Sequence, residues 1–483
     1  MAGLSKSRLI AWRQCPKRLW LQINRPELVV WDNAQSARMD SGNVVGEVAR
    51  GLWPEGVLID GGDLSQALVD TQTALACRTP IFEATFQHQG ALIRADLLLP
   101  EAGGYRLAEV KSSASVKPYH LADTAIQAWV TRQNGVAIKR VEIAHIDTRF
   151  VYPGQTNYQG LFKHVDVTAD IAPLEGQVPG WIAGARATLA SALPDCTPGD
   201  HCHDPFDCPF LDHCLPAEEN PPQFPVELLP YGGRLAASLR AEGYADLRDV
   251  PREKFSNPKH LRVWEATRTG RAELRPEAGD ALRALAFPRY YLDFETYQFV
   301  IPAWVGTRPY AQQPFQWSCH EESAERILTH TYFLADGSGD PRREFAESML
   351  EAVGTSGPVL VYNAAFERGR IQELARDFPD LAPALDAVIE RLYDLLPLAR
   401  ANYYHPDMQG SWSIKAVLPT IAPDLAYDDL EVAHGGAAQE AFGEILHPDT
   451  TPERRRQLRV ALLQYCERDT LAMVRIAHYF EGI

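Results

Sequence analysis

Two acidic residues stand two positions apart in the segment YYLDFETY, where Asp293 and Glu295 flank one phenylalanine. The apolar residues around them predict a strand, and its period of two points both carboxylates to the same side of a sheet. Two more acids follow at helical positions: Glu367 in YNAAFE, and Asp469 four residues after Tyr465, on the same helix face. Carboxylate oxygens are the ligands that Mg²⁺ and Mn²⁺ prefer. These residues therefore predict a divalent-metal site.

A second group of this kind lies in the first half of the chain. The segment RADLLLP contains Asp96, and AEVKSS contains Glu109 and Lys111, which lie on one side of a predicted strand. Two carboxylates could bind a metal ion here, while the lysine neutralises charge that develops on a substrate. A solvated strand also often contains Glu-x-Lys, so an ordinary exposed strand is the alternative interpretation.

Four of the eight cysteines fall between residues 196 and 214. Cys202, Cys208 and Cys214 are each separated by five residues, and Cys15 lies far away in SRLIAWRQCPKRLW. In a reducing compartment such a group indicates a metal or iron–sulfur site rather than disulfides. Four thiolates also suit Zn²⁺, and further candidate ligands are Cys196, His201, His203 and His213.

The pattern of apolar residues predicts the elements that must position these groups. IFEATF, ALIRADLLLP and YRLAEVKSS are predicted strands, and LADTAIQAWVTRQNG is a predicted helix that ends at Gly135. Together they predict a small mixed sheet flanked by helices. From residue 288 onward strands and helices alternate, ending in the long amphipathic helix RQLRVALLQYCERDTLAMVRIAHYF. We therefore expect an α/β protein with several domains.

Prolines and turn residues mark the predicted boundaries. A linker is expected over residues 215–233, because prolines there forbid regular structure, namely Pro216, Pro221, Pro222, Pro225 and Pro230. The predicted domains are 1–215, a linker with a small helical connector over 216–287, and 288–483. Within the last domain, residues 401–436 are rich in turn residues and aromatics, and we expect surface loops with one helix at SIKAVLPTI.

The composition is that of a folded protein, with 483 residues of which 46% are hydrophobic and 23% charged. No apolar run approaches the roughly 18 residues that cross a bilayer, so we expect a cytoplasmic protein without a membrane partner. The net charge of −16 lowers the expectation of tight non-specific DNA binding. Most of it lies in residues 290–483, with 16 Lys and Arg against 29 Asp and Glu, where bound metal would cancel part of the acid.

The segments after residue 288 resemble the DnaQ-like (DEDD) exonucleases, which have an RNase H-like fold. The family's D-x-E strand is matched by Asp293 and Glu295, and its Y-x-x-x-D helix by Tyr465 and Asp469. Its H-N-x-x-F-D motif is matched by YNAAFE, with Tyr362 for the His and Glu367 for the Asp, and Asp394 stands where such proteins often have a further aspartate. The resemblance implies that the four acids bind two metal ions and that Tyr465 orients the attacking water.

The first 215 residues resemble RecB-like nucleases of the PD-(D/E)XK type. This resemblance implies that Asp96 and Glu109 bind metal, that Lys111 positions the water, and that Gln127 belongs to the same site. It also implies a [4Fe–4S] cluster on Cys15, Cys202, Cys208 and Cys214, which staples the ends of the domain together. One position departs from the family, since Gly46 stands where these nucleases usually have a metal-binding His.

The whole chain resembles an uncharacterised bacterial family of predicted RecB-like nucleases in which both modules are fused. This resemblance implies a Mg²⁺- or Mn²⁺-dependent nuclease that binds nucleic acid, preferably DNA at single strands or ends, in repair or defence. One alternative is a nucleic-acid-binding scaffold with an inactive N-terminal site. Another is a ribonuclease, because DnaQ-like domains act on either nucleic acid.

Overall fold

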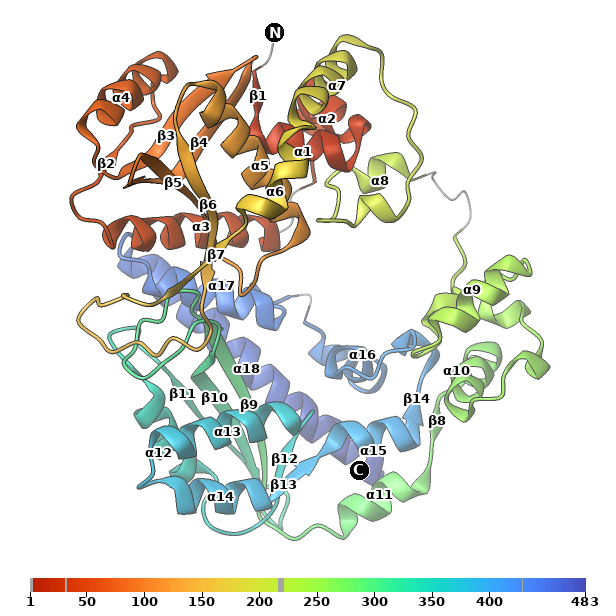
Figure 1. Ribbon diagram of the computed structural model, residues 1–483. Coiled ribbons are helices and arrows are strands. Elements are labelled where there is room, and N and C mark those ends of the chain that lie inside the picture. The colour runs from red at the N-terminus through yellow and green to blue at the C-terminus, as the bar shows by residue number, and fades with distance from the viewer. Residues whose placement is uncertain (1–2, 31–32, 216–220, 428) are drawn as a thin grey trace. The chain divides into compact units, whose positions relative to one another are not determined.

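The computed structural model describes residues 3–30, 33–215, 221–427 and 429–483, without the side chains of residues 33–41. Part of the predicted linker, residues 216–220 with Pro216, lies outside the described residues. The chain divides into two compact units (Figure 1). The first comprises Met1–Ala217 and Phe299–Tyr310, and the second comprises Glu218–Gln298 and Ala311–Ile483.

A seven-stranded mixed sheet lies at the centre of the first unit, in the order β2-β3-β4-β5-β6-β7, with β1 paired to β4. Its strands are β1 (Leu4–Ser5), β2 (Val57–Leu58), β3 (Ile81–His88), β4 (Ala91–Glu101), β5 (Gly104–Lys111), β6 (Ile138–Ile146) and β7 (Phe162–Asp166). Strands β3, β4 and β5 are antiparallel neighbours, whereas β5 and β6 are parallel because a helix, α5, connects them. Both residues of the turn between β3 and β4, Gln89 and Gly90, have positive φ, as a tight hairpin turn requires.

Helices cover both faces of this sheet. The helices of the first unit are α1 (Lys6–Gln14), α2 (Pro16–Asn24), α3 (Asn33–Gly51), α4 (Leu64–Cys77), α5 (Pro118–Gln133), α6 (Thr168–Glu175), α7 (Val178–Ala190) and α8 (Leu211–Cys214). On one face, Leu9 of α1, Ile126 of α5 and Ile182 of α7 are buried in one apolar cluster. On the other face, Ala49 of α3 packs with Phe82 of β3. The predicted strands and the helix after them are confirmed.

The second unit contains a five-stranded sheet in the order β11-β10-β9-β12-β13. Its strands are β9 (Arg289–Gln298), β10 (Gln312–Glu322), β11 (Leu328–Leu334), β12 (Val359–Val361) and β13 (Leu392–Asp394). Strands β9, β10 and β11 are antiparallel, and β12 and β13 run parallel to β9. A small ribbon pairs β8 (Glu273–Leu274) with β14 (Tyr403–Tyr404). The protein is thus an α/β protein with mixed sheets and many helices, as the sequence predicts.

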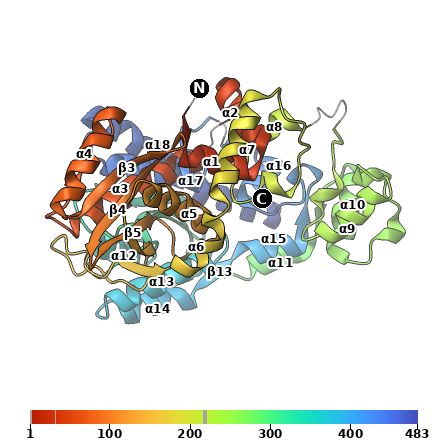
Figure 2. The same cartoon turned by 45° about the horizontal axis from the view of Figure 1, so that its top comes forward.

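The helices of the second unit are α9 (Gly233–Ala241), α10 (Pro258–Thr269), α11 (Pro276–Arg283), α12 (Arg342–Ala352), α13 (Ala365–Asp377), α14 (Ala382–Glu390), α15 (Leu395–Asn402), α16 (Ile414–Ile421), α17 (Gly435–Leu446) and α18 (Pro452–Glu481). Among them, α12, α13 and α14 cover one side of the larger sheet and α18 covers the other. Leu292 and Phe294 of β9 pack with α12, α13 and α14, so the alternate residues of β9 face α18. Helices α9 and α10 lie side by side at one end of the unit (Figure 2).

The prediction of surface loops over residues 401–436 is wrong in part. The helix at SIKAVLPTI is confirmed as α16, but several aromatic residues of this region are buried in the core: Tyr403, Tyr404, Trp412 and Tyr427. Trp412 and Tyr427 lie outside regular elements and Tyr403 and Tyr404 form a strand of only two residues, so no periodicity in the sequence indicates their burial. Among the described residues, no helix is long and apolar enough to cross a membrane.

Candidate active site and metal-binding pockets

Three carboxylates meet between β9 and α18 in the second unit. Asp293 and Glu295 lie on the face of β9 that α18 covers, and Asp469 lies on α18. Ligand oxygens of these three residues all lie within 4.8 Å of one another. Glu295 and Asp469 are only 8% and 6% exposed. The period of two along the strand and the period of 3.6 along the helix thus bring together the acids that the sequence singles out.

Glu367, in the first turn of α13, is a fourth acid, and its charge contributes to raising the pKa values of Asp293 and Glu295. Its side chain is buried, and its Oε2 atom has no hydrogen-bond partner among the described residues. Burial raises the pKa of Glu367 to about 8. A buried carboxylate oxygen without a partner costs free energy unless something positive binds it. We call Asp293, Glu295, Glu367 and Asp469 the carboxylate cluster.

The turn that leads to Glu367 is held by Asp394. The two carboxylate oxygens of Asp394 accept hydrogen bonds from the backbone N–H groups of Asn363 and Ala364, both at 3.0 Å. One of these oxygens also caps α15 by accepting from the N–H of Leu396. Asn363 has φ +86°, a left-handed conformation that asparagine tolerates better than most residues. Asp394 therefore positions the start of α13 and is not itself in the carboxylate cluster.

Mutual repulsion and burial dominate the electrostatics of the carboxylate cluster. Burial raises the pKa values of Asp293 and Glu295 well above their ordinary range, and the charge of Asp469 adds to the effect. Burial also raises the pKa of Asp469 to about 6, although a hydrogen bond from the Tyr427 hydroxyl opposes the rise. Such shifts are expected where carboxylates gather without a cation between them. The donor set and the orphaned oxygen of Glu367 fit one or more hard divalent ions.

Three further side chains touch or face the carboxylate cluster, and the sequence did not single them out. The thiol of Cys466 lies 3.6 Å from an oxygen of Asp293, and Tyr427 donates to Asp469. The ammonium of Lys415 lies 4.8 Å from the ring centre of Tyr465 and 5.1 Å from that of Tyr427. Lys415 is the single lysine in residues 290–483, which is the one signal that could have identified it.

Lys415 is a cation that acts on Asp293, Glu295 and Asp469, and Arg370 acts on Glu367. Burial lowers the pKa of Lys415, and the charges of Asp469 and Glu295 oppose that change. Its ammonium donates to the carbonyl oxygen of Ala433 at 2.6 Å and forms no ion pair with a carboxylate among the described residues. Lys415 therefore reduces the negative potential of the site without occupying the oxygens that a metal ion would need.

In the first unit, a row of acids crosses the sheet. Leu97 of β4 pairs with Phe82 of β3 and with Ala108 of β5. One residue further along these antiparallel strands, Asp96 of β4 therefore lies between Glu83 of β3 and Glu109 of β5. These three residues line a cavity of about 260 Å³ together with Gly46, Arg50 and Lys111. Burial and the charge of Glu109 raise the pKa of Asp96 to about 8. The strand register therefore brings the predicted Asp96, Glu109 and Lys111 together.

Positive and amide groups already contact Glu109. One oxygen accepts from Lys111 at 2.7 Å, and the other accepts from Gln127 of α5. Lys111 also contacts Asp123, which lies four residues before Gln127 on the same helix face. Burial would raise the pKa of Glu109, but Lys111 and Lys6 hold it well below its ordinary value. The sequence did not single out Asp123 or Lys6.

Gly46 lines the same cavity and offers no ligand. A Cβ atom built there would meet only an Arg50 nitrogen, at 3.5 Å, which is ordinary van der Waals contact. A side chain is therefore sterically acceptable at this position, and the missing imidazole is not imposed by crowding.

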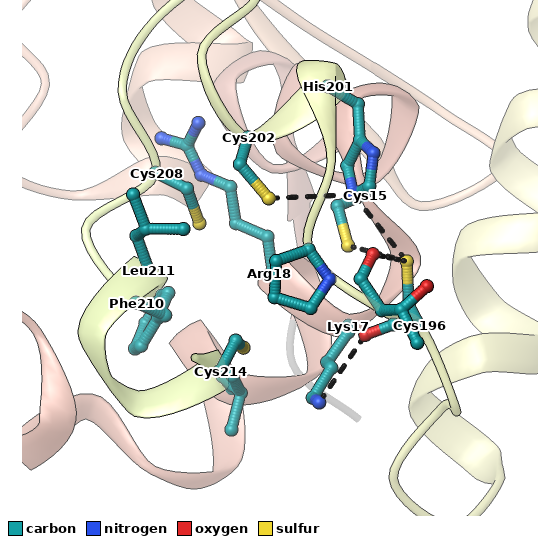
Figure 3. Close-up of a pocket in the computed structure, with 13 residues that line it drawn as sticks. Cys15, Lys17, Arg18, Cys196, His201, Cys202, Cys208, Phe210, Leu211 and Cys214 are labelled. Atoms are coloured by element: carbon teal, nitrogen blue, oxygen red, sulfur yellow. Dashed lines mark hydrogen bonds between the residues drawn. The ribbon is translucent and has the colours of Figure 1, made fainter. Parts of the chain in front are cut away.

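The third site is a cysteine pocket in the first unit (Figure 3). Its lining includes six potential metal ligands, namely Cys15, Cys196, His201, Cys202, Cys208 and Cys214. Cys196 Sγ lies 3.6 Å from Cys15 Sγ and 3.6 Å from His201 Nε2, and Cys202 Sγ lies 3.7 Å from the same nitrogen. Burial and the neighbouring Cys15 raise the pKa of Cys196 to about 11.

The predicted four cysteines thus line one pocket, and Cys196 and His201 join them. Lys17 and Arg18 also line the pocket, where their positive charges suit thiolates or an anionic cluster. Thiolates at this density can hold either an iron–sulfur cluster or Zn²⁺.

Comparisons with known proteins find one domain model that matches part of the chain and several relatives. Residues 290–413 match a domain of unknown function, DUF2779. The chain is 24% identical over 228 residues to the uncharacterized protein UU173 of Ureaplasma parvum serovar 3, covering 43% of this chain and 33% of that protein. It is 33% identical over 208 residues to the uncharacterized MG366 homolog of Mycoplasma pneumoniae, covering 39% of this chain and 31% of that protein.

The chain spans about a third of the length of these curated relatives. No solved structure matches.

Proposed function

We propose that the protein is a metal-dependent nuclease and that the carboxylate cluster of the second unit is its main catalytic site. The observation that carries this proposal is the convergence of Asp293, Glu295 and Asp469 within 4.8 Å, in a site where burial raises their pKa values. Buried acids in such an arrangement are characteristic of a functional site. The strand order β11-β10-β9-β12-β13, with two parallel strands after three antiparallel ones, supports the proposed DnaQ-like exonuclease on an RNase H-like fold.

In this proposal Asp293, Glu295, Glu367 and Asp469 hold Mg²⁺ or Mn²⁺. Two divalent ions in such a site supply activation of water and stabilisation of the leaving oxygen. Tyr465 is 4% exposed and lies beside Lys415, so its hydroxyl can orient a water but is a poor base, because burial raises its pKa further. Lys415 offsets negative charge that gathers when a phosphate enters.

The N-terminal pocket is the second proposed site, of the RecB-like PD-(D/E)XK type, with Asp96 and Glu109 as metal ligands. Its support is the row of acids beside Lys111 and Gln127. The cysteine pocket is proposed to hold a [4Fe–4S] cluster on Cys15, Cys202, Cys208 and Cys214, with Zn²⁺ as the alternative. A metal centre of this kind needs cysteines that are not oxidised to disulfides, and the cytoplasm keeps thiols reduced. We therefore also propose that the protein is cytoplasmic.

The proposed substrate is DNA with single strands or free ends, in repair or defence. The direct test is digestion of end-labelled single- and double-stranded DNA and RNA by anaerobically purified protein, with Mn²⁺, Mg²⁺ or EDTA. Metal-dependent shortening of DNA supports the proposal. Digestion of RNA alone would identify a ribonuclease, and no digestion with intact nucleic-acid binding would identify a scaffold.

A further inference from the structure

A second lysine, Lys6 at the start of α1, contacts Glu109, which lines the N-terminal pocket. Its ammonium lies 2.7 Å from Oε1 of Glu109 and 3.5 Å from Oδ2 of Asp123. Lys111 lies 2.7 Å from the same Glu109 oxygen. The Lys6 side chain is 23% exposed and the Glu109 side chain 2% exposed, so this pair is shielded from water far more than a surface ion pair.

These contacts leave Glu109 little capacity for a metal ion. A carboxylate has about four lone-pair positions. Lys6 and Lys111 take two on one oxygen, and Gln127 takes one on the other. Asp96, the other expected ligand, accepts from the backbone N–H of Val110 at 2.7 Å. Gly46 adds no ligand. The pocket as it stands therefore fits a divalent ion less well than the carboxylate cluster does.

The acids of the N-terminal pocket are largely neutralised by ion pairs, whereas those of the carboxylate cluster are not. In the N-terminal pocket, Lys6 and Lys111 pair with Glu109 and Asp123, and Arg50 lies 3.6 Å from Glu83. Of the four acids there, only Asp96 forms no ion pair with a described residue. In the carboxylate cluster, by contrast, none of the four acids forms one with any residue that the structure describes.

The position of Lys6 depends on the helix that carries it. Helix α1 ends beside Cys15, which lines the cysteine pocket. Its last residue, Gln14, donates to the carbonyl oxygens of His201 and Phe206 at 2.8 and 2.7 Å. One nine-residue helix therefore connects the segment that carries the cysteines to the pocket that contains Glu109.

We propose that Lys6 is a resident counter-cation of the N-terminal pocket, where it takes the place of a divalent ion and sets the metal affinity of Asp96 and Glu109. A metal ion can bind tightly there only when the Lys6 ammonium leaves Glu109. This inference rests on the proposal that Asp96 and Glu109 are metal ligands, but it needs no nuclease activity in either site.

The test is a Mn²⁺ titration followed by electron paramagnetic resonance of free Mn²⁺, in a D293N/E295Q background that disables the carboxylate cluster. K6M removes the charge and keeps the length of the side chain, whereas K6R keeps the charge. We expect K6M to bind one Mn²⁺ at least about tenfold more tightly than the background, because a unit charge beside the site repels a divalent ion. We expect K6R to remain within about threefold of the background.

A third variant assigns the gained affinity to the pocket. Adding D96N to K6M should return Mn²⁺ binding to the background level. Thermal unfolding and the metal content of the cysteine pocket verify that each variant is folded. The proposal is overturned if folded K6M binds Mn²⁺ no more tightly than the background, or if its gain survives D96N. Neither outcome depends on whether DNA is cleaved, so failure here is distinct from failure of the proposed function.

Discussion

The carboxyl groups of Glu367 and Asp469 have pKa values of about 8 and about 6, chiefly because they are buried. Their ordinary values lie near 4. The folded protein without metal therefore binds more protons than the unfolded chain between about pH 4 and pH 8. By linkage, these groups lower the stability of the metal-free protein as the pH rises through that window.

This relation predicts how metal and pH act together. In EDTA, the melting temperature should fall as the pH is raised from 6 to 8. Mn²⁺ should raise the melting temperature more at pH 8 than at pH 6, since the ion binds the ionised carboxylates. E367Q is the control, because it removes one titrating group and should reduce the fall. A melting temperature in EDTA that rises equally from pH 6 to pH 8 in both proteins would contradict the shifted pKa values.

The hydroxyl of Tyr427 should influence the pH dependence of activity through Asp469. Its hydrogen bond to Asp469 lowers the pKa of that carboxyl, so Y427F should raise it and move the acidic limb of the activity profile to higher pH. Y403F is a matched control, because Tyr403 is a buried tyrosine whose hydroxyl bonds to Thr420 instead. An unchanged pH profile in Y427F would show that Asp469 does not limit activity.

Sequence periodicity was sufficient to predict which acids share a face, but not what approaches that face. Asp293 and Glu295 follow the strand period, and Tyr465 and Asp469 follow the helix period. Lys415, in contrast, reaches the cluster from α16, whose place in the fold depends on long-range packing that no local pattern encodes. Asp123 carried a local signal, its spacing of four from Gln127 on α5.

At the scale of elements, the turn between β12 and α13 depends on one side chain. D394A removes the acceptor of three backbone N–H groups, so we expect a loss of about 1 kcal/mol or more in the free energy of unfolding. The affinity for Mn²⁺ should also fall, because this turn positions the first turn of α13, which contains Glu367. D394N should keep much of the stability, since asparagine also caps helices.

Urea unfolding and Mn²⁺ titration of both variants measure these effects. Equal stability of D394A and the unaltered protein would contradict a positioning role for Asp394.

Regular elements were predictable because their apolar residues repeat with a clear period. The strand YYLDFETYQFV and the final long helix occur where the sequence places them. The many turn residues in residues 401–436 predict surface loops. Their aromatic side chains are nevertheless buried, since Tyr403 packs with Tyr479 and Phe480 of α18, contacts that lie more than 70 residues apart in sequence.

At the scale of the whole molecule, the cysteine pocket unites Cys15 with residues almost 200 positions later. Protein purified without oxygen should be brown with about four irons per chain, and C202A should lose them, because Cys202 is a predicted ligand. C77A is the control, because Cys77 is exposed and lies outside the pocket. Colourless protein with one tightly bound zinc would contradict the iron–sulfur cluster and show that the pocket binds Zn²⁺ instead.

We propose that the carboxylate cluster, rather than the N-terminal pocket, is the main catalytic site. The most direct measurement compares Mn²⁺-dependent digestion of end-labelled single-stranded DNA by the unaltered protein, by D293N/E295Q and by K111M. We predict that D293N/E295Q loses activity by about a thousandfold or more, because ionised ligands of the metal are gone, while K111M retains most of it. Full activity in D293N/E295Q together with its loss in K111M would contradict the claim and assign catalysis to the pocket of Asp96 and Glu109.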